Sequence, residues 1–536
     1  MPERQAAPST ALSPALDAWR RALGSPHVSV EPSATQSAST ATFATSADVM
    51  AILRPGTREE VQQCVRIANQ FRVPLYPIST GKNWGYGSRA PARDAVLLDL
   101  GRLNRIIDFS ESLAYVTIEP GVTQRQLYEF LQAQRSKLWM DATGSSPDCS
   151  VIGNTLERGF GHTPMGDHCS QACGFKIVLP TGDYVETGFS RFPQTRTGPL
   201  SRWGVGPSLD GLFSQSNLGI VTGMTVWLMP APDVFQAFVF QSDKPIGPVI
   251  EALRPLRLNG TLRSVMHIGN DYKILAGANQ YPWGSTGGKT PLTADAMDRI
   301  RRELRITRWS GSGGIYGTRG QIREARSLLH RALAGKVDRI QFVDDRKLAL
   351  LRRIEKPYRA LTKRTDLQRA VTILPGLIDL LQGKPTEAFL GSSYWRKTMP
   401  PPANLDPDAD RCGLLWCSPV APMSGEAVTE VTDIARETTL RHGFEPILTV
   451  SLVNERMTIS TIALTYDRSV AGEDGRAMTC YRELADRLVE RGYPPYRLNV
   501  GSMDYGLAGE GYGNTLRAIK TALDPNGILA PGRYDG

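Results

Sequence analysis

A glycine-rich turn at residues 77–87 has the composition of an anion-binding loop. Its sequence is PISTGKNWGYG, and it follows a short apolar stretch. Glycine lets the backbone approach a ligand closely, and successive free N–H groups can form an anion-binding nest. A pyrophosphate is the natural occupant, although the spacing matches neither a Walker A loop nor the GxGxxG start of an NAD-binding helix. Taken alone, the motif leaves an ordinary glycine-rich turn open as the alternative.

Further sequence blocks follow this turn in a recognisable order. They are VLLDLGRLNRI, YVTIEPGVT, GNTLERGFGHTPMGDH at 153–168, DGLFSQSNLGIVTGMTVWLMP at 210–230, WCSPVAP at 416–422, and YRLN and DPNGILAPGR near the end. Together they resemble the flavoprotein family that includes vanillyl-alcohol oxidase, eugenol oxidase and the flavoprotein subunit of 4-cresol dehydrogenase. The resemblance covers nearly the whole chain from about residue 47.

The resemblance implies an FAD-dependent oxidoreductase with a two-lobed α+β fold. In this PCMH-type (p-cresol methylhydroxylase-type) fold, a cap of antiparallel sheet and helices covers the flavin. We expect an N-terminal arm at 1–46, an FAD-binding domain at 47–231, a cap at 232–499, and a segment at 500–536 that returns to the FAD-binding domain. Residues at matching positions are expected to bind the cofactor: Ser79, Thr80, Gly81, Lys82, Asn83, Ser150, Val151, Asn154, Gly159, Gly161, His162, Ile220, Val221 and Arg533.

Three residues match the family's phenol-binding positions: Tyr86, Tyr496 and Arg497. The resemblance implies that they bind the hydroxyl oxygen of a 4-alkylphenol and act in catalysis. A cation and two O–H donors favour phenolate over phenol, which lowers the phenol pKa. The phenolate then promotes hydride transfer from the benzylic carbon to the flavin and leaves a quinone methide. The alternative for each tyrosine is an ordinary buried aromatic side chain with a satisfied hydroxyl.

The residues that attach FAD covalently in relatives have no clear counterpart. The histidine used by vanillyl-alcohol oxidase corresponds to Leu414, and the tyrosine used by the cresol enzyme corresponds to Ser393, with Tyr394 one residue away. Leucine cannot form the bond, and an offset of one residue turns a side chain elsewhere. We therefore predict non-covalent FAD, with Tyr394 as the reserve candidate for attachment.

The catalytic carboxylate of the oxidase branch is also replaced. Its position holds Ser145 or Ser146, flanked by Asp141 and Asp148. Either aspartate could serve if the loop turned it inward, but we expect both to be surface or turn carboxylates.

The cap lobe has lost further acid and base groups. The cresol enzyme's glutamate corresponds to Thr449, and the family's paired histidines correspond to Thr458 and Ile459. His162 lies in the flavin-lining block and could hydrogen-bond the cofactor, whereas His267 is expected to be a satisfied core histidine. Hydride abstraction survives these losses better than directed addition of water.

Composition narrows the class of protein further. The chain has 536 residues, a net charge of +9 and seven cysteines. Scattered basic residues without a nucleic-acid-binding motif argue against nucleic acid, and the absence of a long apolar stretch argues against a membrane span. Basic clusters at 299–308 and 346–369 are solvated helix faces or a docking surface for an electron-acceptor protein. We expect no metal site, reduced cysteines, a cytoplasmic location and a homodimer or larger assembly.

The favoured function is oxidation of a para-substituted phenol at its benzylic carbon. One alternative keeps the flavin but acts on a non-phenolic or secondary-metabolite alcohol as a tailoring enzyme. An alternative of another class is a flavin-holding protein with little turnover. The sequence leaves the exact substrate and the electron acceptor open.

The elements that must position these residues can be predicted from their spacing. Thr57 with Glu60, and Thr123 with Gln126, have capping-box spacing before two amphipathic helices. Apolar stretches at 73–78, 95–100 and 115–119 predict strands, and a helix is expected around 16–23. Residues 33–46 are expected to form a covering arm or loop. Residues 151–229 predict a mixed sheet around a ligand, and residues 400–410 a proline-rich loop.

Overall fold

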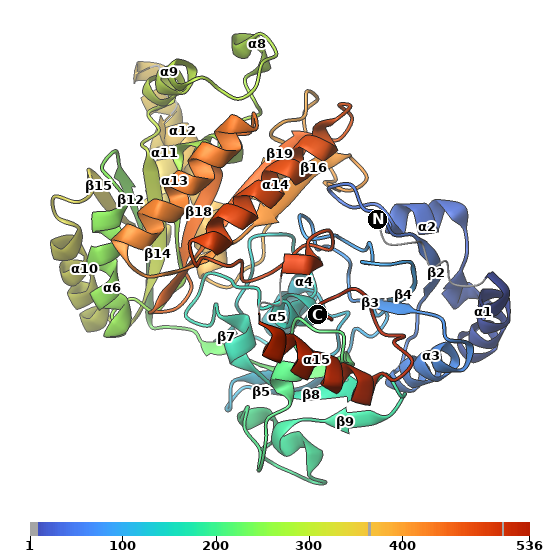
Figure 1. Ribbon diagram of the computed structural model, residues 1–536. Helices are drawn as coiled ribbons and strands as arrows, with labels where there is room; N and C mark the ends of the chain where they lie inside the picture. Colours follow the sequence, from blue (N-terminus) through green and yellow to red (C-terminus); the bar gives the residue numbers. More distant parts are fainter. Residues whose placement is uncertain (1–8, 363–365, 506–508, 536) are drawn as a thin grey trace.

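The protein folds into two lobes with the C-terminal segment packed on the first (Figure 1). The computed structural model describes residues 9–362, 366–505 and 509–535. The first lobe contains a four-stranded and a five-stranded sheet, and the second is built on one eight-stranded sheet. This arrangement confirms the α+β fold with an antiparallel cap that the sequence predicted.

The four-stranded sheet supplies the loop that begins the candidate site. Its strand order is β1-β2-β4-β3, and β3 runs parallel to β4, so that both strands end near the glycine-rich turn. Thr57 caps the following helix as predicted, since its hydroxyl accepts from the Glu60 amide at 3.2 Å. The elements are α1 (Ser9–Leu23), β1 (Val28–Ser29), α2 (Pro32–Ala38), β2 (Val49–Leu53), α3 (Arg58–Phe71), β3 (Leu75–Ile78) and β4 (Ala95–Asp99).

The five-stranded sheet differs from the prediction in its strand directions. Its order is β5-β6-β10-β8-β9, and every neighbouring pair is antiparallel, so the mixed sheet predicted for residues 151–229 is wrong. Two of these pairs, β5 with β6 and β8 with β9, are joined by short turns, which connect antiparallel neighbours, whereas parallel neighbours need a crossover. The elements are β5 (Ile106–Ser110), β6 (Tyr115–Ile118), α4 (Gln124–Ala133), β7 (Leu138–Trp139), α5 (Val151–Leu156), β8 (Ala172–Val178), β9 (Tyr184–Glu186), β10 (Ile220–Trp227) and β11 (Met229–Pro230).

The cap sheet begins directly after these strands. Its order is β15-β12-β14-β13-β18-β19-β16, with β17 also paired to β19, and the pairs are antiparallel. Its strands are β12 (Val234–Ser242), β13 (Met266–Asn270), β14 (Trp309–Gly317), β15 (Arg339–Val343), β16 (Cys412–Cys417), β17 (Val420–Pro422), β18 (Ile447–Leu452) and β19 (Met457–Asp467). The predicted boundary at 231/232 falls between β11 and β12.

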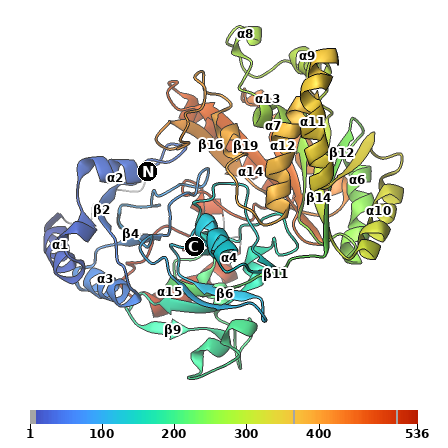
Figure 2. The ribbon, with the colours of Figure 1, turned by 180° about the vertical axis from the view of Figure 1, so that it is seen from behind.

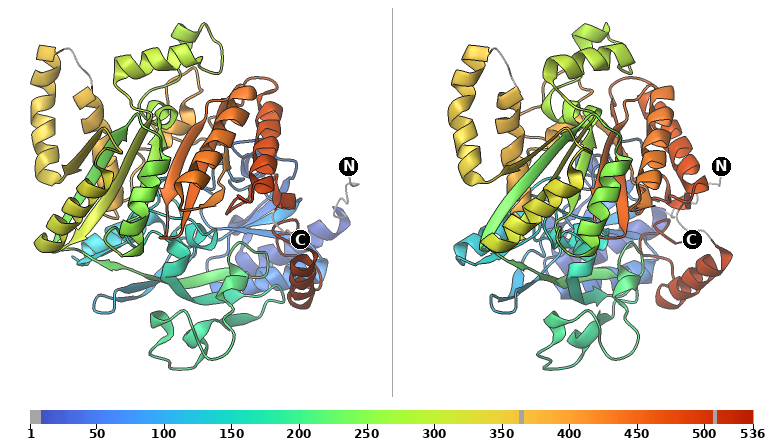
Figure 3. Two further views of the ribbon diagram at one scale, coloured as in Figure 1. Left: turned by 60° about the vertical axis from the view of Figure 1, so that its left-hand side comes forward. Right: turned by 90° about the vertical axis from the view of Figure 1, so that its left-hand side faces the viewer.

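Helices cover the two faces of the cap sheet unequally. Helices α6, α10, α13 and α14 lie on one face and form the largest apolar core with it (Figures 1 and 3). Helices α11 and α12 lie on the other side, in front in Figure 2. The helices are α6 (Gly247–Leu258), α7 (Asp271–Ala278), α8 (Trp283–Thr286), α9 (Ala294–Leu304), α10 (Arg319–Leu333), α11 (Asp345–Thr362), α12 (Asp366–Leu381), α13 (Gly425–Arg441) and α14 (Glu473–Glu490).

The C-terminal segment returns to the first lobe through helix α15 (Glu510–Leu523). Beyond this helix, Leu529 forms a bridge with Leu75 at the start of β3. The end of the chain therefore lies beside the strand that leads into the glycine-rich turn.

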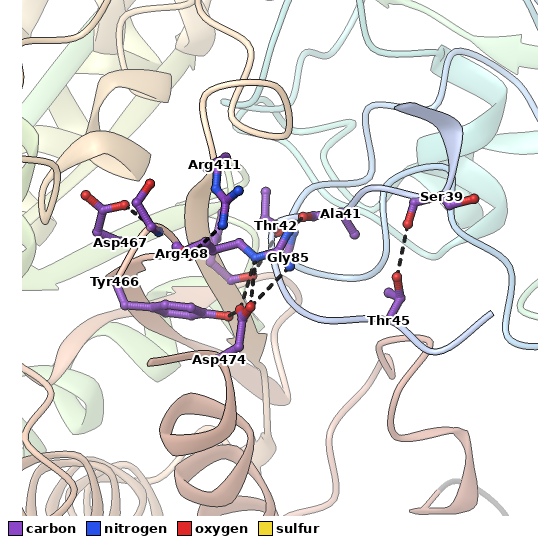
Figure 4. A network of polar contacts seen from close by, with 12 residues as sticks. Ser39, Ala41, Thr42, Thr45, Gly85, Arg411, Tyr466, Asp467, Arg468 and Asp474 are labelled. Carbon is purple, nitrogen blue, oxygen red and sulfur yellow. Dashed lines mark hydrogen bonds and ion pairs between the residues drawn. The ribbon is translucent and has the colours of Figure 1, made fainter. Parts of the chain in front are cut away.

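The N-terminal arm is a structural link between the lobes rather than a loose cover. Part of it, α2, is helical where the sequence predicted only an arm or loop. Thr42 accepts from the Gly85 amide at 2.9 Å and donates to the Leu414 carbonyl at 2.9 Å. Arg468 donates to the Ala41 carbonyl and pairs with Asp474 (Figure 4). The arm thereby fixes the glycine-rich turn against strand β16.

Candidate active site

A cavity of about 1180 Å³ lies between the cap sheet and the first lobe. Most of the predicted cofactor and phenol residues line it, although they come from distant parts of the chain. They are Ser79, Thr80, Gly81, Lys82, Asn83, Tyr86, Ser150, Asn154, Gly159, His162, Ile220, Val221, Tyr496, Arg497 and Arg533. Their roles stay predictions, but the fold brings them around one cavity.

The glycine-rich turn has the free donors that a pyrophosphate needs. Within the described residues, the backbone amides at 80–84 donate to no protein acceptor. Gly81 has a φ of +71°, a conformation that residues with a side chain rarely adopt. Consecutive unpaired N–H groups facing a cavity form the nest that the sequence predicted. The residues present therefore fit the diphosphate of FAD.

The start of helix α5, which comes about 60 residues later in the chain, lies against the turn. Ser150 caps α5 by accepting from the Gly153 amide at 2.9 Å, and its own amide donates to the Thr80 hydroxyl at 3.1 Å. A Cβ on Gly153 would lie 2.5 Å from the Ser79 hydroxyl oxygen. The turn and the start of the helix are thus held so close together that a side chain at position 153 would displace the Ser79 hydroxyl.

Tyr86, Tyr496 and Arg497 are brought together as the sequence predicted. The Arg497 guanidinium lies 4.1 Å from the centre of the Tyr86 ring, and all three residues line the cavity. The Tyr86 hydroxyl is 2.9 Å from the Ser418 hydroxyl. Burial raises the pKa of Tyr86 well above that of a free phenol, so that this side chain stays a proton donor.

Sequence reasoning missed Glu157, which joins the two arginines of the site. Its carboxylate accepts from Arg497 Nε at 3.0 Å and also pairs with Arg533. Burial alone would raise the pKa of Glu157, but Arg533 and Arg497 together hold it below its usual value. Two guanidiniums and one carboxylate leave one net positive charge in the buried cluster. The only sequence signal was a lone acidic residue in a glycine-rich block.

Asp141 does not lie on the surface, which corrects the prediction for this carboxylate. Only 4% of its side chain is exposed, and its oxygens lie 2.6 Å from His168 Nε2 and 2.6 Å from the Thr163 amide. Burial would raise the pKa of Asp141, but these hydrogen bonds hold it below its usual value. The side chain supports the loop at 161–163 and does not line the main cavity. Asp148 is partly exposed and binds Arg125, as expected.

Two predicted cofactor contacts lie beside the cavity rather than on its wall. Val151 begins helix α5 and packs against the neighbouring apolar core. Gly161 is turned so that a Cβ would lie 1.5 Å from an Asp141 oxygen. Its carbonyl oxygen is 3.2 Å from His267 Nε2. Neither residue is among those that line the cavity.

The two histidines of the site lie side by side. The ring centres of His162 and His267 are 4.3 Å apart, and both rings line the cavity. His267 also has a nitrogen 2.9 Å from the Ser451 hydroxyl, so both of its nitrogens have partners, as expected of a satisfied histidine. Burial, together with His162, lowers the pKa of His267 well below its usual value. The ring is therefore neutral and joins the cap to the flavin-lining block.

The positions matched to covalent attachment point in different directions. Leu414 and Ser393 line the cavity. They replace the histidine and the tyrosine that the resemblance gives as the residues of covalent attachment. Tyr394 is buried, and its hydroxyl donates to Asp410 outside the cavity wall. Burial also raises the pKa of Tyr394 above its usual range, which opposes formation of a reactive phenolate.

We expect FAD to be released by acid. Denaturing the purified yellow protein with trichloroacetic acid should leave the flavin absorbance in the supernatant, because Leu414 and Ser393 cannot form the bond and Tyr394 faces Asp410. Absorbance at the flavin maximum in supernatant and washed pellet is the measurement. A yellow pellet would show covalent attachment and overturn the prediction.

Among the described residues, no group of three or more His, Cys, Asp or Glu side chains is placed to hold a metal ion. The cysteines in this part of the chain are unpaired. No helix in the described ranges is both long and apolar enough to cross a membrane.

Comparisons with known proteins agree on one kind of fold and cofactor. A model of the FAD binding domain matches residues 49–188. The chain is 46% identical to the 1'-carboxy-chondrochloren decarboxylase of Chondromyces crocatus, over 98% of this chain and 97% of that protein. It is 31% identical to the 4-cresol dehydrogenase (hydroxylating) flavoprotein subunit of Pseudomonas putida, over 89% of this chain and 86% of the relative. The 4-ethylphenol oxidase from Gulosibacter chungangensis, solved with isoeugenol, superposes with a TM-score of 0.88 at 29% identity, covering 99% of this chain and 98% of that one.

Proposed function

The chain belongs to the PCMH-type family of FAD-dependent oxidoreductases, and we propose that it removes a hydride from the benzylic carbon of a para-substituted phenol. The observation that carries the proposal is the convergence of Tyr86, Tyr496 and Arg497 on the cavity wall. The proposal also includes a homodimer or larger assembly in the cytoplasm, with oxygen or a protein as the electron acceptor.

The residues act on the phenol oxygen. Arg497 and Arg533 both pair with Glu157, so the three side chains together keep one net positive charge, and Arg497 presents it to the phenol oxygen. Tyr86, held protonated by burial, supplies an O–H donor, and Tyr496 supplies the second. These groups lower the pKa of the bound phenol, since each stabilises the anion more than the neutral form. FAD, when bound, accepts the hydride that the electron-rich ring releases from its para side chain.

An anaerobic titration tests this function. Mixing the yellow holoenzyme with 4-ethylphenol in the absence of oxygen should bleach the flavin band, and 4-ethylanisole should not, because its oxygen cannot ionise. The measurement is stopped-flow absorbance at the flavin maximum. Failure of a range of para-alkylphenols to bleach the band would favour the flavin-holding protein with little turnover.

A second candidate is oxidation coupled to loss of a side-chain carboxylate. It is favoured by the extensive similarity to a protein named as a decarboxylase of a carboxylated compound. In a para-hydroxyphenyl substrate with a carboxylate on the carbon next to the benzylic position, hydride loss yields a quinone methide. The bond to the carboxylate then breaks, its electron pair forms the side-chain double bond, and the ring returns to phenolate as CO₂ leaves. Once the phenol has lost its proton to the solvent, these steps need no further base and no added water.

The protein's own cap residues suit this second outcome. Thr449, Thr458 and Ile459 stand where the sequence predicted the loss of acid and base groups. Thr458 and Ile459 are buried, and Thr449 lines the cavity. In the same anaerobic reaction, a carboxylated substrate should release CO₂ in equal amount to the flavin reduced. A hydroxylated acid that retains its carboxylate would exclude decarboxylation while leaving hydride removal intact.

A further inference from the structure

One face of the cap sheet presents a polar row to the cavity. Strand pairing sets Thr461 beside Thr449, Thr449 beside Gly269, and Gly269 beside Ser310. Side chains of neighbouring strands at paired positions lie on the same face of a sheet. All four residues line the cavity. The row therefore crosses the cavity wall and consists of small or hydroxyl-bearing residues.

Lys273 fills the gap that glycine leaves in this row. A Cβ on Gly269 would lie 3.1 Å from Lys273 Cγ, so the lysine stem passes over that position. The stem comes from helix α7, and the side chain lines the cavity. Within residues 9–362, 366–505 and 509–535, its ammonium has no hydrogen bond or ion pair, and burial is the one influence on its pKa. The structure thus places an unpaired cation on the cavity wall.

The surroundings of Lys273 lack the groups that would neutralise it. Among the described lining residues the one carboxylate is Glu157, which is already shared by two arginines. The hydroxyls of Thr449 and Thr461 have no hydrogen-bond partner in the described part of the chain. Burial lowers the pKa of Lys273, a cost that an anionic ligand would offset. A partly buried cation beside unpaired hydroxyl donors is the chemistry of a carboxylate-binding site.

The polar row lies one substrate side chain away from the phenol-binding residues. Phe160 has its ring centre 6.0 Å from that of Tyr496 and 6.1 Å from that of His267. His267 and Gly269 are two residues apart on strand β13, so they face the same side about 7 Å apart. A substrate with its phenol at Tyr496 therefore extends past His267 toward Lys273.

We propose that Lys273, with the hydroxyls of Thr449 and Thr461, binds a carboxylate on the side chain of the phenolic substrate. The inference rests on the proposed function and deepens it, because it assigns the substrate class as para-hydroxyphenyl carboxylic acids. Lys273 binds and positions the acid; the hydroxyl at the other end contacts Arg497 and the two tyrosines.

Paired ligands that differ in one charge test the subsite. We use 4-hydroxycinnamate and its methyl ester, which lack a benzylic sp³ C–H bond and so report binding without turnover. Calorimetry on the holoenzyme should show that Lys273→Met weakens binding of the acid by about 10- to 100-fold, and weakens the ester by less than about threefold. Lys273→Arg, which keeps the charge, should restore most of the acid's affinity.

Lys347 gives a matched control in the same cavity. Its ammonium already donates to the Phe342 carbonyl at 2.9 Å, so Lys347→Met should leave the acid-to-ester ratio unchanged. Equal weakening of acid and ester in Lys273→Met would overturn the subsite and show a structural role. Equal affinity of the wild-type protein for acid and ester would also overturn it.

Failure of the subsite is distinguishable from failure of the proposed function. The acid-to-ester ratio is a binding measurement, whereas the function is judged by flavin bleaching with 4-ethylphenol. Bleaching without charge preference would leave the function standing and remove the subsite. Charge preference that depends on Lys273, without bleaching by any phenol, would keep the anion site and remove the oxidation.

Discussion

Arg497→Ala is expected to slow anaerobic flavin reduction by a para-alkylphenol by a factor of about 10²–10³, the usual effect of removing one group that stabilises an oxyanion. Arg497 lies against the Tyr86 ring, and its cluster with Glu157 and Arg533 carries one net positive charge. Its loss leaves Glu157 paired with Arg533 alone, which removes that surplus. Stopped-flow absorbance of the flavin at several pH values is the measurement.

The pH profile separates charge stabilisation from damage to the fold. Because Arg497 lowers the pKa of the bound phenol, the pH at which reduction becomes fast should rise in the variant toward about 10, the value for a free phenol. Arg497→Lys keeps a positive charge and should recover part of the rate. Arg491→Ala is the control, because Arg491 is largely exposed and pairs with Glu430 outside the site. A wild-type rate in Arg497→Ala would remove the phenolate mechanism.

Glu157→Ala is expected to destabilise the protein by about 3–5 kcal/mol, the cost of breaking a buried ion pair. The substitution leaves Arg497 and Arg533 uncompensated in one cluster, where the carboxylate had separated them. Urea unfolding followed by fluorescence should show a lower midpoint. Glu59→Ala is the control: its pair with Arg58 is exposed, and the loss should be at most about 1 kcal/mol.

The contribution of Glu157 should depend on pH in a defined direction. Its two arginines hold the folded-state pKa below the value of an unfolded glutamate, about 4.3. The stabilisation is therefore complete above that value and is lost as the pH falls through the folded-state pKa. The difference between wild type and Glu157→Gln should be constant near neutral pH and shrink below about pH 4. A constant difference throughout the acid range would contradict this account.

Several features of the fold could be predicted because their causes lie within a few residues. In the helix caps of Thr57 and Thr123, the threonine hydroxyl accepts from the backbone amide three residues later. The strands β3, β4 and β6 follow from short apolar stretches. In contrast, β2 and β5 were not predicted, and α2 was predicted as part of an arm, since pairing and packing with distant segments decide such short elements.

The candidate site also has features that could be predicted from the sequence and features that could not. The free amides at 80–84 could be predicted, because glycine content and a nearby strand end fix the local backbone. The burial of Asp141 could not, because its partners His168 and Thr163 come together only when the loop at 161–168 folds back. The orientation of Tyr394 could not be predicted either, because its hydroxyl bonds to Asp410, sixteen residues away in the chain.

The sequence by itself determined the family and the cofactor, and it predicted the nest for the diphosphate and the three phenol-binding candidates. The tertiary structure alone decided which charges meet: Glu157 lies 340 residues before Arg497 in the chain, yet its carboxylate accepts a hydrogen bond from Arg497 Nε. It also decided that Lys273 lies over Gly269 on the cavity wall without a partner among the residues that the structure describes. The physical reason is range: backbone preferences act over a few residues, whereas the pairing of buried charges depends on how sheets and helices from distant segments pack.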